Sequence, residues 1–140
     1  MDARERRWLF VLICVFVVFN LVVLSPLIPW QRWLIWSRPE PSQRFAIDFQ
    51  DYEIHLPPEG IEIVVGEYVE FVATSQDVTY GLGVFRPDHS LVFQMQVLPG
   101  HQNSMIWQFD TPGSYDVRST EYSGPRHSEM YIADAIRVTQ

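Results

Sequence analysis

The chain has 140 residues, of which 47% are hydrophobic and 14% aromatic, and its formal net charge is −7 at pH 7. From Phe45 onward four arginines oppose fourteen Asp and Glu side chains, a balance of −10, which argues against nucleic acid as a partner. This length allows one small domain beside an apolar segment. The single cysteine, Cys14, lies in that apolar segment, so the domain has neither a disulfide framework nor a thiolate metal site.

The apolar segment runs from Trp8 to Pro29 without a formal charge. Twenty-two helical residues reach about 33 Å, enough to cross a bilayer core, with Asn20 as the one strongly polar interruption. A secretory signal would have a shorter apolar core followed by small residues, whereas Pro26 and Trp30 occur here. The sequence therefore predicts a retained membrane-spanning helix.

Three tryptophans spaced three apart follow within residues 30–36, a pattern typical of a segment at the membrane surface, with a quinol-binding role as the alternative. A proline-rich stretch at 37–44 then reads as a linker. We expect residues 1–36 to form the anchor and interfacial segment, 37–44 the linker and 45–140 one domain.

The domain sequence is strand-like throughout. Short runs of alternating or apolar residues end at Gly and Pro turns, and no helical period is convincing after residue 36. The expected strands are 45–49, 52–56, 61–65, 68–73, 91–97, 104–109, 115–118 and 135–139. This spacing predicts an all-β Greek-key sandwich or barrel, and about 95 residues can bury a modest two-sheet core.

One loop carries the pattern of a metal site from which ligands are missing. Its positions are Ser119, Glu121, Ser123, His127 and Met130. With cysteines in place of both serines, the spacing would become Cys-x3-Cys-x3-His-x2-Met. Two thiolates at that spacing can bridge two copper ions, whereas neutral serine hydroxyls are poor ligands for soft copper.

Three further motifs occur in order with this loop: T-S-Q-D-V-T-Y-G-L at 74–82, V-L-P-G at 97–100, and F-D-T-P-G-S-Y at 109–115. Together the four motifs resemble subunit II of haem-copper respiratory oxidases, in its B-type single-span form, over roughly residues 60–140. In that family the first motif supplies another histidine ligand, at the position of Tyr80, and Glu121 would ligate through its backbone carbonyl.

The resemblance implies a cupredoxin-like sandwich with a degenerate dinuclear copper (CuA) site and no metal in this chain. The expected function is a non-catalytic subunit II of an oxygen or nitric oxide reductase. Haem, with or without copper, would belong to a multi-span catalytic subunit I, and electrons would come from quinol or directly from a c-type cytochrome. The chain would cross a bacterial or archaeal cell membrane once, with its N-terminus in the cytoplasm and its domain outside.

The alternative is a membrane-anchored electron carrier or copper chaperone with one copper ion. His127 and Met130 would hold the ion, with His89 or His101 recruited as a further ligand. If no metal binds, we expect Tyr80, the two serines and His127 to form a hydrogen-bonded plug. Arg118 and Arg126 would pair with Glu121 and Glu129, or with haem propionates of a catalytic subunit, and Asp77 would cap its own loop.

Overall fold

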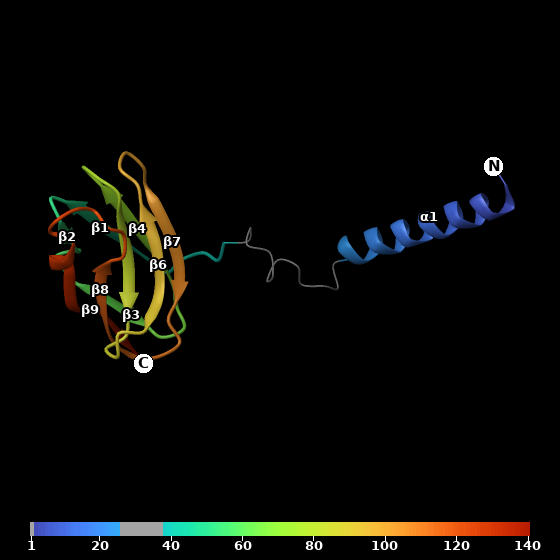
Figure 1. Cartoon of the computed structure of the whole chain (residues 1–140). Helices are drawn as coiled ribbons and strands as arrows, with labels where there is room; N and C mark the ends of the chain where they lie inside the picture. The colour runs from blue at the N-terminus through green and yellow to red at the C-terminus, as the bar shows by residue number, and fades with distance from the viewer. Residues whose placement is uncertain (1, 26–37) are drawn as a thin grey trace. The chain divides into compact units, whose positions relative to one another are not determined.

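The computed structural model describes residues 2–25 and 38–140 (Figure 1). These residues fall into two compact units, one containing the N-terminal helix and one, Pro39–Gln140, containing all the strands. The predicted tryptophan-rich segment at 30–36 lies outside the described residues.

The N-terminal unit is a single apolar helix, α1 (Ala3–Val23). The helix begins five residues before the apolar run because the Asp2 carboxylate accepts hydrogen bonds from the N–H groups of Arg4 and Glu5, while Glu5 accepts one from Asp2. With 21 residues and a mean hydropathy of 2.1, α1 is long and apolar enough to cross a membrane. The Asn20 amide donates to the Phe16 carbonyl one turn earlier, which gives one of its N–H groups a partner within the helix.

The domain is a sandwich of two β-sheets. The first sheet has the order β2-β1-β4-β7 and the second the order β3-β9-β8-β5-β6. The strands are β1 (Gln43–Gln50), β2 (Glu53–His55), β3 (Ile61–Val64), β4 (Tyr68–Ser75), β5 (Tyr80–Phe85), β6 (Leu91–Val97), β7 (Asn103–Gln108), β8 (Gly113–Ser119) and β9 (Tyr131–Thr139). The prediction of a two-sheet sandwich is therefore confirmed.

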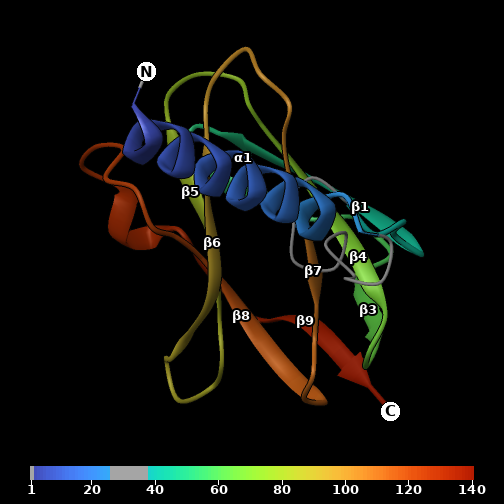
Figure 2. The same cartoon turned by 90° about the vertical axis from the view of Figure 1, so that its right-hand side faces the viewer.

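Strand register gathers four connections at one end of the sandwich. β1 and β4 are parallel and finish together, with Phe49 opposite Ser75, and the antiparallel partners of Tyr80 and Leu82 are Val97 and Ser119. We call this the loop end; it comprises residues 51–52, 76–79, 98–102 and 120–130. Figure 2 shows the 120–130 loop, with its 3-10 turn η1 (His127–Glu129), at the opposite end of β9 from the C-terminus.

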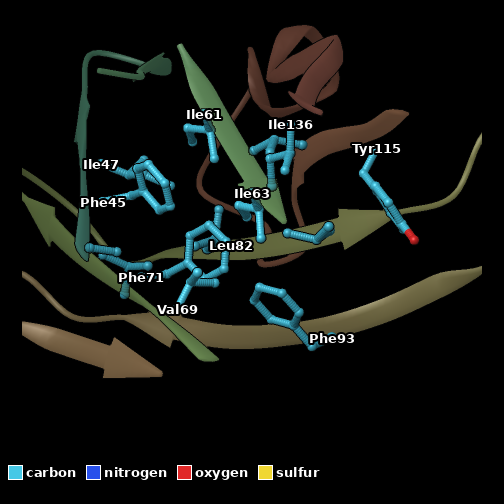
Figure 3. Packing of buried hydrophobic residues seen from close by; sticks show 14 of the residues in the cluster. Phe45, Ile47, Ile61, Ile63, Val69, Phe71, Leu82, Phe93, Tyr115 and Ile136 are labelled. Carbon is cyan, nitrogen blue, oxygen red and sulfur yellow. The ribbon is translucent and has the colours of Figure 1, made fainter. Parts of the chain in front are cut away.

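Alternate residues of both sheets point into the core. Phe45 and Ile47 from β1 and Phe71 from β4 face Ile63 from β3 and Leu82 from β5 (Figure 3). The alternation in β1 and β3 is as expected for strands with one face buried, because successive side chains point to opposite faces. The core is also rich in aromatic contacts, including the Phe71 and Phe93 rings, whose centroids lie 5.3 Å apart.

β5 was not among the expected strands because Gly81 and Gly83 weaken its strand pattern. Both glycines have a packing reason. A Cβ at Gly81 would lie 2.2 Å from Thr120 Oγ1, and one at Gly83 would lie 2.4 Å from Thr120 Cγ2. The absence of side chains on this face of β5 lets Thr120 fold over the strand.

Other strand ends also differ from the expected ones. β1 begins at Gln43, two residues inside the predicted linker, and β9 begins at Tyr131 instead of residue 135. The early part of β9 was missed because Tyr131–Ala135 lacks a regular alternation, and Asp134 there has a positive φ of 51°.

Two neighbouring residues of β3 test this packing. Ile63 is 1% exposed in the core, whereas Glu62 points outward. Ile63→Ala should lower the free energy of unfolding by about 2–5 kcal/mol, because it leaves a cavity, and Glu62→Ala by no more than about 0.5 kcal/mol. Urea unfolding of the detergent-solubilised chain, followed by circular dichroism, measures both; equal effects would contradict the assigned register.

Candidate functional site

The site at the loop end is built around the Tyr80 hydroxyl. Tyr80 is fully buried at the start of β5, and its ring stacks on Phe49 with centroids 5.4 Å apart. The hydroxyl donates to Asp77 Oδ2 at 3.0 Å and accepts from the Tyr52 N–H at 3.2 Å. One phenol therefore joins the start of β5 to the 76–79 loop and to the turn between β1 and β2.

Asp77 is the acceptor for several groups of this end. Its carboxylate accepts from the N–H groups of Asp51 (2.8 Å) and Val78 (2.7 Å) and from the hydroxyls of Tyr80 and Ser75. Desolvation opposes ionisation, but these hydrogen bonds outweigh it and lower the pKa of Asp77. Desolvation, together with the nearby Asp77 carboxylate, raises the pKa of the Tyr80 hydroxyl. The predicted capping role of Asp77 is confirmed, and it reaches beyond its own loop.

The turn between β1 and β2 is held in an unusual backbone conformation. Asp51 and Tyr52 have positive φ values of 51° and 64°, each at a cost of roughly 1–2 kcal/mol for a residue with a Cβ. Both N–H groups are used, one by Asp77 and one by Tyr80, and the Tyr52 hydroxyl donates to the Ser123 carbonyl at 3.2 Å. The turn is thus fixed by Asp77 and Tyr80 on one side and by the 120–130 loop on the other.

The two serines, one at the end of β8 and one in the 120–130 loop, both donate to the same backbone carbonyl. Ser119 is 1% exposed; its Oγ accepts from the Gly81 N–H and donates to the Glu121 carbonyl, both at 3.4 Å. Ser123 donates to the same carbonyl at 2.9 Å. Both hydroxyls therefore converge on the Glu121 backbone oxygen, which is the group expected to ligate in the resembling family.

His127 and Met130 lie beside this network, and the Met130 carbonyl accepts a hydrogen bond from the Ser119 N–H at 3.1 Å. Met130 is 2% exposed and its N–H donates to the His127 carbonyl at 3.2 Å. The His127 Nδ1 atom is buried and has no hydrogen-bond partner among the described residues. The His127 ring lies 5.8 Å from that of Tyr122, which is 80% exposed.

Of the predicted arginine pairs, one is present. Arg126 Nε lies 2.9 Å from Glu129 Oε2, as expected. The pairing of Arg118 with Glu121 is wrong: the Arg118 guanidinium lies over the Phe85 and Tyr131 rings, 5.0 and 5.3 Å from their centroids. An aromatic pair of this kind attracts a guanidinium through the negative ring faces.

The single plug that we expected is also wrong. Tyr80 bonds to Asp77 and Tyr52, the serines bond to Glu121, and His127 contributes no Nδ1 hydrogen bond within the described residues. Tyr52 connects the two groups because its N–H meets Tyr80 and its hydroxyl meets the loop at Ser123. The two-residue connection between strand patterns at 45–49 and 52–56 was the available signal for that turn.

The donors at this end do not fit a dinuclear thiolate-bridged copper centre. A bridged centre needs sulfur ligands at positions 119 and 123 and an imidazole at position 80, where hydroxyls stand instead. Across residues 2–25 and 38–140, three or more His, Cys, Asp or Glu side chains nowhere gather in a way that could hold a metal ion. His89 follows β5 at the far end of the sandwich, so it cannot assist His127, whereas His101 is exposed in a loop-end connection.

This fold and this end of the sandwich define the class of protein. Auracyanin B matches 74% of the chain and 93% of its own chain with a TM-score of 0.57 at 13% identity. The periplasmic domain of subunit II of cytochrome oxidase of Bradyrhizobium japonicum matches 73% and 87%, with a TM-score of 0.51 at 16% identity. The domain is a cupredoxin-like β-sandwich, preceded by an apolar helix.

Sequence comparison gives a more particular relationship. Over 87 residues the chain is 32% identical to cytochrome c oxidase subunit 2 of Thermus thermophilus, and the match covers 62% of this chain and 56% of that protein. A second cytochrome c oxidase subunit 2 of the same species is also 32% identical, with 45% of its length covered, so the chain spans about half the length of these curated relatives. Over the matched residues the chain is similar in sequence to cytochrome c oxidase subunit 2. No protein-family model matches it.

A chain of a heme-copper terminal oxidase dimer has the same overall extent. That match covers 99% of this chain and 100% of the other, with a TM-score of 0.55 at 24% identity. At this identity the likeness concerns the fold.

The Tyr80 hydroxyl can be tested by Tyr80→Phe. Loss of the hydroxyl leaves the Tyr52 N–H without its acceptor and removes one donor from Asp77, so the free energy of unfolding should fall by about 1–3 kcal/mol. Tyr122→Phe alters a hydroxyl on an 80% exposed residue and serves as the control, with an expected change within about 0.5 kcal/mol. Equal urea midpoints for the two variants would refute the role assigned to Tyr80.

The lowered pKa of Asp77 predicts a pH dependence of stability. A carboxyl with a depressed pKa stabilises the fold above its unfolded pKa of about 3.9, and this contribution is lost as pH falls through the folded pKa. Asp77→Asn should therefore be less stable than the unaltered chain at pH 7, and the difference should shrink below about pH 4. Unfolding free energies measured between pH 7 and 3 test this; a constant difference over the whole range would contradict it.

Proposed function

We propose that this chain is a non-catalytic subunit II of a membrane haem-copper terminal reductase that works without a dinuclear copper centre. The observation that carries the proposal is the combination of sequence similarity to cytochrome c oxidase subunit 2 with hydroxyl side chains at positions 80, 119 and 123. Neutral hydroxyls at these positions cannot replace bridging thiolates and an imidazole as copper ligands.

The hydrogen bonds of the loop end support a structural role for it in place of a metal-binding one. Tyr80 is buried with both a donor and an acceptor role, and both serine hydroxyls have acceptors. Buried polar groups are costly unless they are paired in this way. In our proposal the domain covers the outer side of a multi-span haem-binding subunit I, and helix α1 anchors it in the bilayer with its N-terminus in the cytoplasm.

Under this proposal, electrons do not enter the complex through copper in this chain. We propose that electrons reach the haem subunit from quinol in the membrane or from a c-type cytochrome that reduces the haem directly. Oxygen and nitric oxide are both compatible acceptors, because the reacting centre would belong to the partner subunit.

One observation favours a second candidate, a single-copper carrier. The His127 Nδ1 atom is buried without a partner in the described part of the chain, and the Met130 thioether is three residues away. An imidazole and a thioether are both ligands for copper, although two ligands are too few for a tight site.

Purification of the native complex tests both candidates. The proposed function predicts haem in the complex, no more copper than one ion per catalytic subunit, and no visible absorption from a thiolate-bridged copper pair. Purification of the chain without any haem subunit would contradict it. Additional copper that His127→Ala removes and the control His89→Ala retains would favour the single-copper carrier; His89 is exposed in the connection between β5 and β6, at the far end of the sandwich.

A further inference from the structure

Two tyrosine rings, those of Tyr80 and Tyr52, lie in series between the core and the 120–130 loop. This loop corresponds to the metal-site loop of the resembling family. Tyr80 stacks on Phe49, and the Tyr52 ring meets Tyr80 edge-on, with centroids 6.4 Å apart and planes at 87°. The Tyr52 hydroxyl continues the series by donating to the Ser123 carbonyl. The side chain of Tyr52 thus extends from the residue-80 position to the loop.

The loop backbone is fitted closely around Tyr52. A Cβ at Gly124 would lie 2.2 Å from the Tyr52 hydroxyl oxygen and 3.0 Å from Cζ, so a side chain there would collide with the ring. Gly124 also has a φ of 136°, which favours glycine. The Arg126 guanidinium also lies near the ring, 5.7 Å from the Tyr52 centroid. The loop therefore has little room to move toward Tyr80 while Tyr52 is in place.

Tyr52 is also held against withdrawal. Its N–H donates to the Tyr80 hydroxyl, and the preceding N–H of Asp51 donates to Asp77. These two bonds fix a turn whose backbone angles an isolated chain rarely adopts. The ring cannot leave the loop without breaking the hydrogen bond to Ser123 and disturbing this turn.

We propose that Tyr52, held by the hydrogen bond of Asp51 to Asp77 and by its own hydroxyl bond to Ser123, excludes a dinuclear copper centre from the loop end even when every ligand is restored. The inference rests on the proposed function, since it concerns the same site. Besides the missing ligands, the Tyr52 ring would be a second obstacle to copper binding. A dinuclear centre would have to lie between the residue-80 side chain and the loop, where the Tyr52 ring now makes its contacts.

The test rebuilds the ligand set in the full-length chain with Cys14→Ala in every variant. The rebuilt chain carries Ser119→Cys, Ser123→Cys and Tyr80→His. Two derivatives add Tyr52→Gly, which tolerates the positive φ of 64° and removes the ring, or Tyr52→Phe, which keeps the ring. Each is titrated with a Cu(II) salt, and bound copper and visible thiolate-to-copper absorption are measured.

We expect the Tyr52→Gly derivative to bind copper about tenfold more tightly than the rebuilt chain with Tyr52 and its Tyr52→Phe derivative. The reason is that removal of the ring relieves overpacking where the copper ions would lie. Formation of the absorbing centre to the same extent with Tyr52 present would overturn the proposal. Circular dichroism and the melting temperature establish that each variant is folded before the comparison.

A copper-free measurement covers the case in which a rebuilt variant does not fold. In a chain with only Cys14→Ala and Ser119→Cys, addition of Tyr52→Gly should speed reaction of the new thiol with a small thiol reagent about tenfold, because the loop loses its support. An unchanged rate would count against the proposal. Copper in this chain of the native complex would instead refute the proposed function, whatever the rebuilt variants bind.

Discussion

The hydrogen bonds of the Tyr80 hydroxyl set the structure of the loop end. A phenol buried in a sandwich core must find a polar partner, and Tyr80 finds Asp77 on one side and the Tyr52 N–H on the other. Those two contacts hold together the 76–79 loop and the turn at Asp51 and Tyr52. This turn presents the Tyr52 hydroxyl to Ser123, so the position of the 120–130 loop depends on a turn that joins two strands of the other sheet.

This dependence explains how a positive-φ turn without glycine can persist. Tight two-residue hairpins usually place Asn or Gly where φ is positive, and the chain has Asp51 and Tyr52 instead. The backbone N–H groups of both residues donate to Asp77 and Tyr80, and the Tyr52 hydroxyl adds a contact that glycine could not make, its hydrogen bond to the Ser123 carbonyl. The backbone strain is local, while the contacts that offset it reach across both sheets, which is typical of a site under structural constraint.

Much of the fold could be predicted from the sequence, because alternation in β1 and β3 reports directly on one-sided burial. β5 could not, since the reason for Gly81 and Gly83 is Thr120, almost forty residues away. The candidate site shows the same limit. The motif spacing located Tyr80, Ser119, Ser123 and His127 at one end of the sandwich, but it could not tell which hydroxyl would bond to which acceptor. Tyr52 was missed because the short connection between two strand patterns indicates only a turn, whereas the contacts of Tyr52 with Tyr80 and Ser123 depend on strand register and backbone angles.

The hydrogen bonds of these hydroxyls also bear on why, under the proposed function, this end would stay without copper. Tyr80→His alone would remove the acceptor of the Tyr52 N–H without creating a bridged site, because hydroxyls would remain at 119 and 123. Ser119→Cys alone would place a weakly bonding thiol among the Gly81 N–H and the Glu121 carbonyl, where a hydroxyl now bonds. Each single step back toward a ligand therefore gives up a contact before any metal can compensate for it. Residues that share hydrogen bonds in this way are not independent in their effects on stability, so we expect the effects of these substitutions not to add when they are combined.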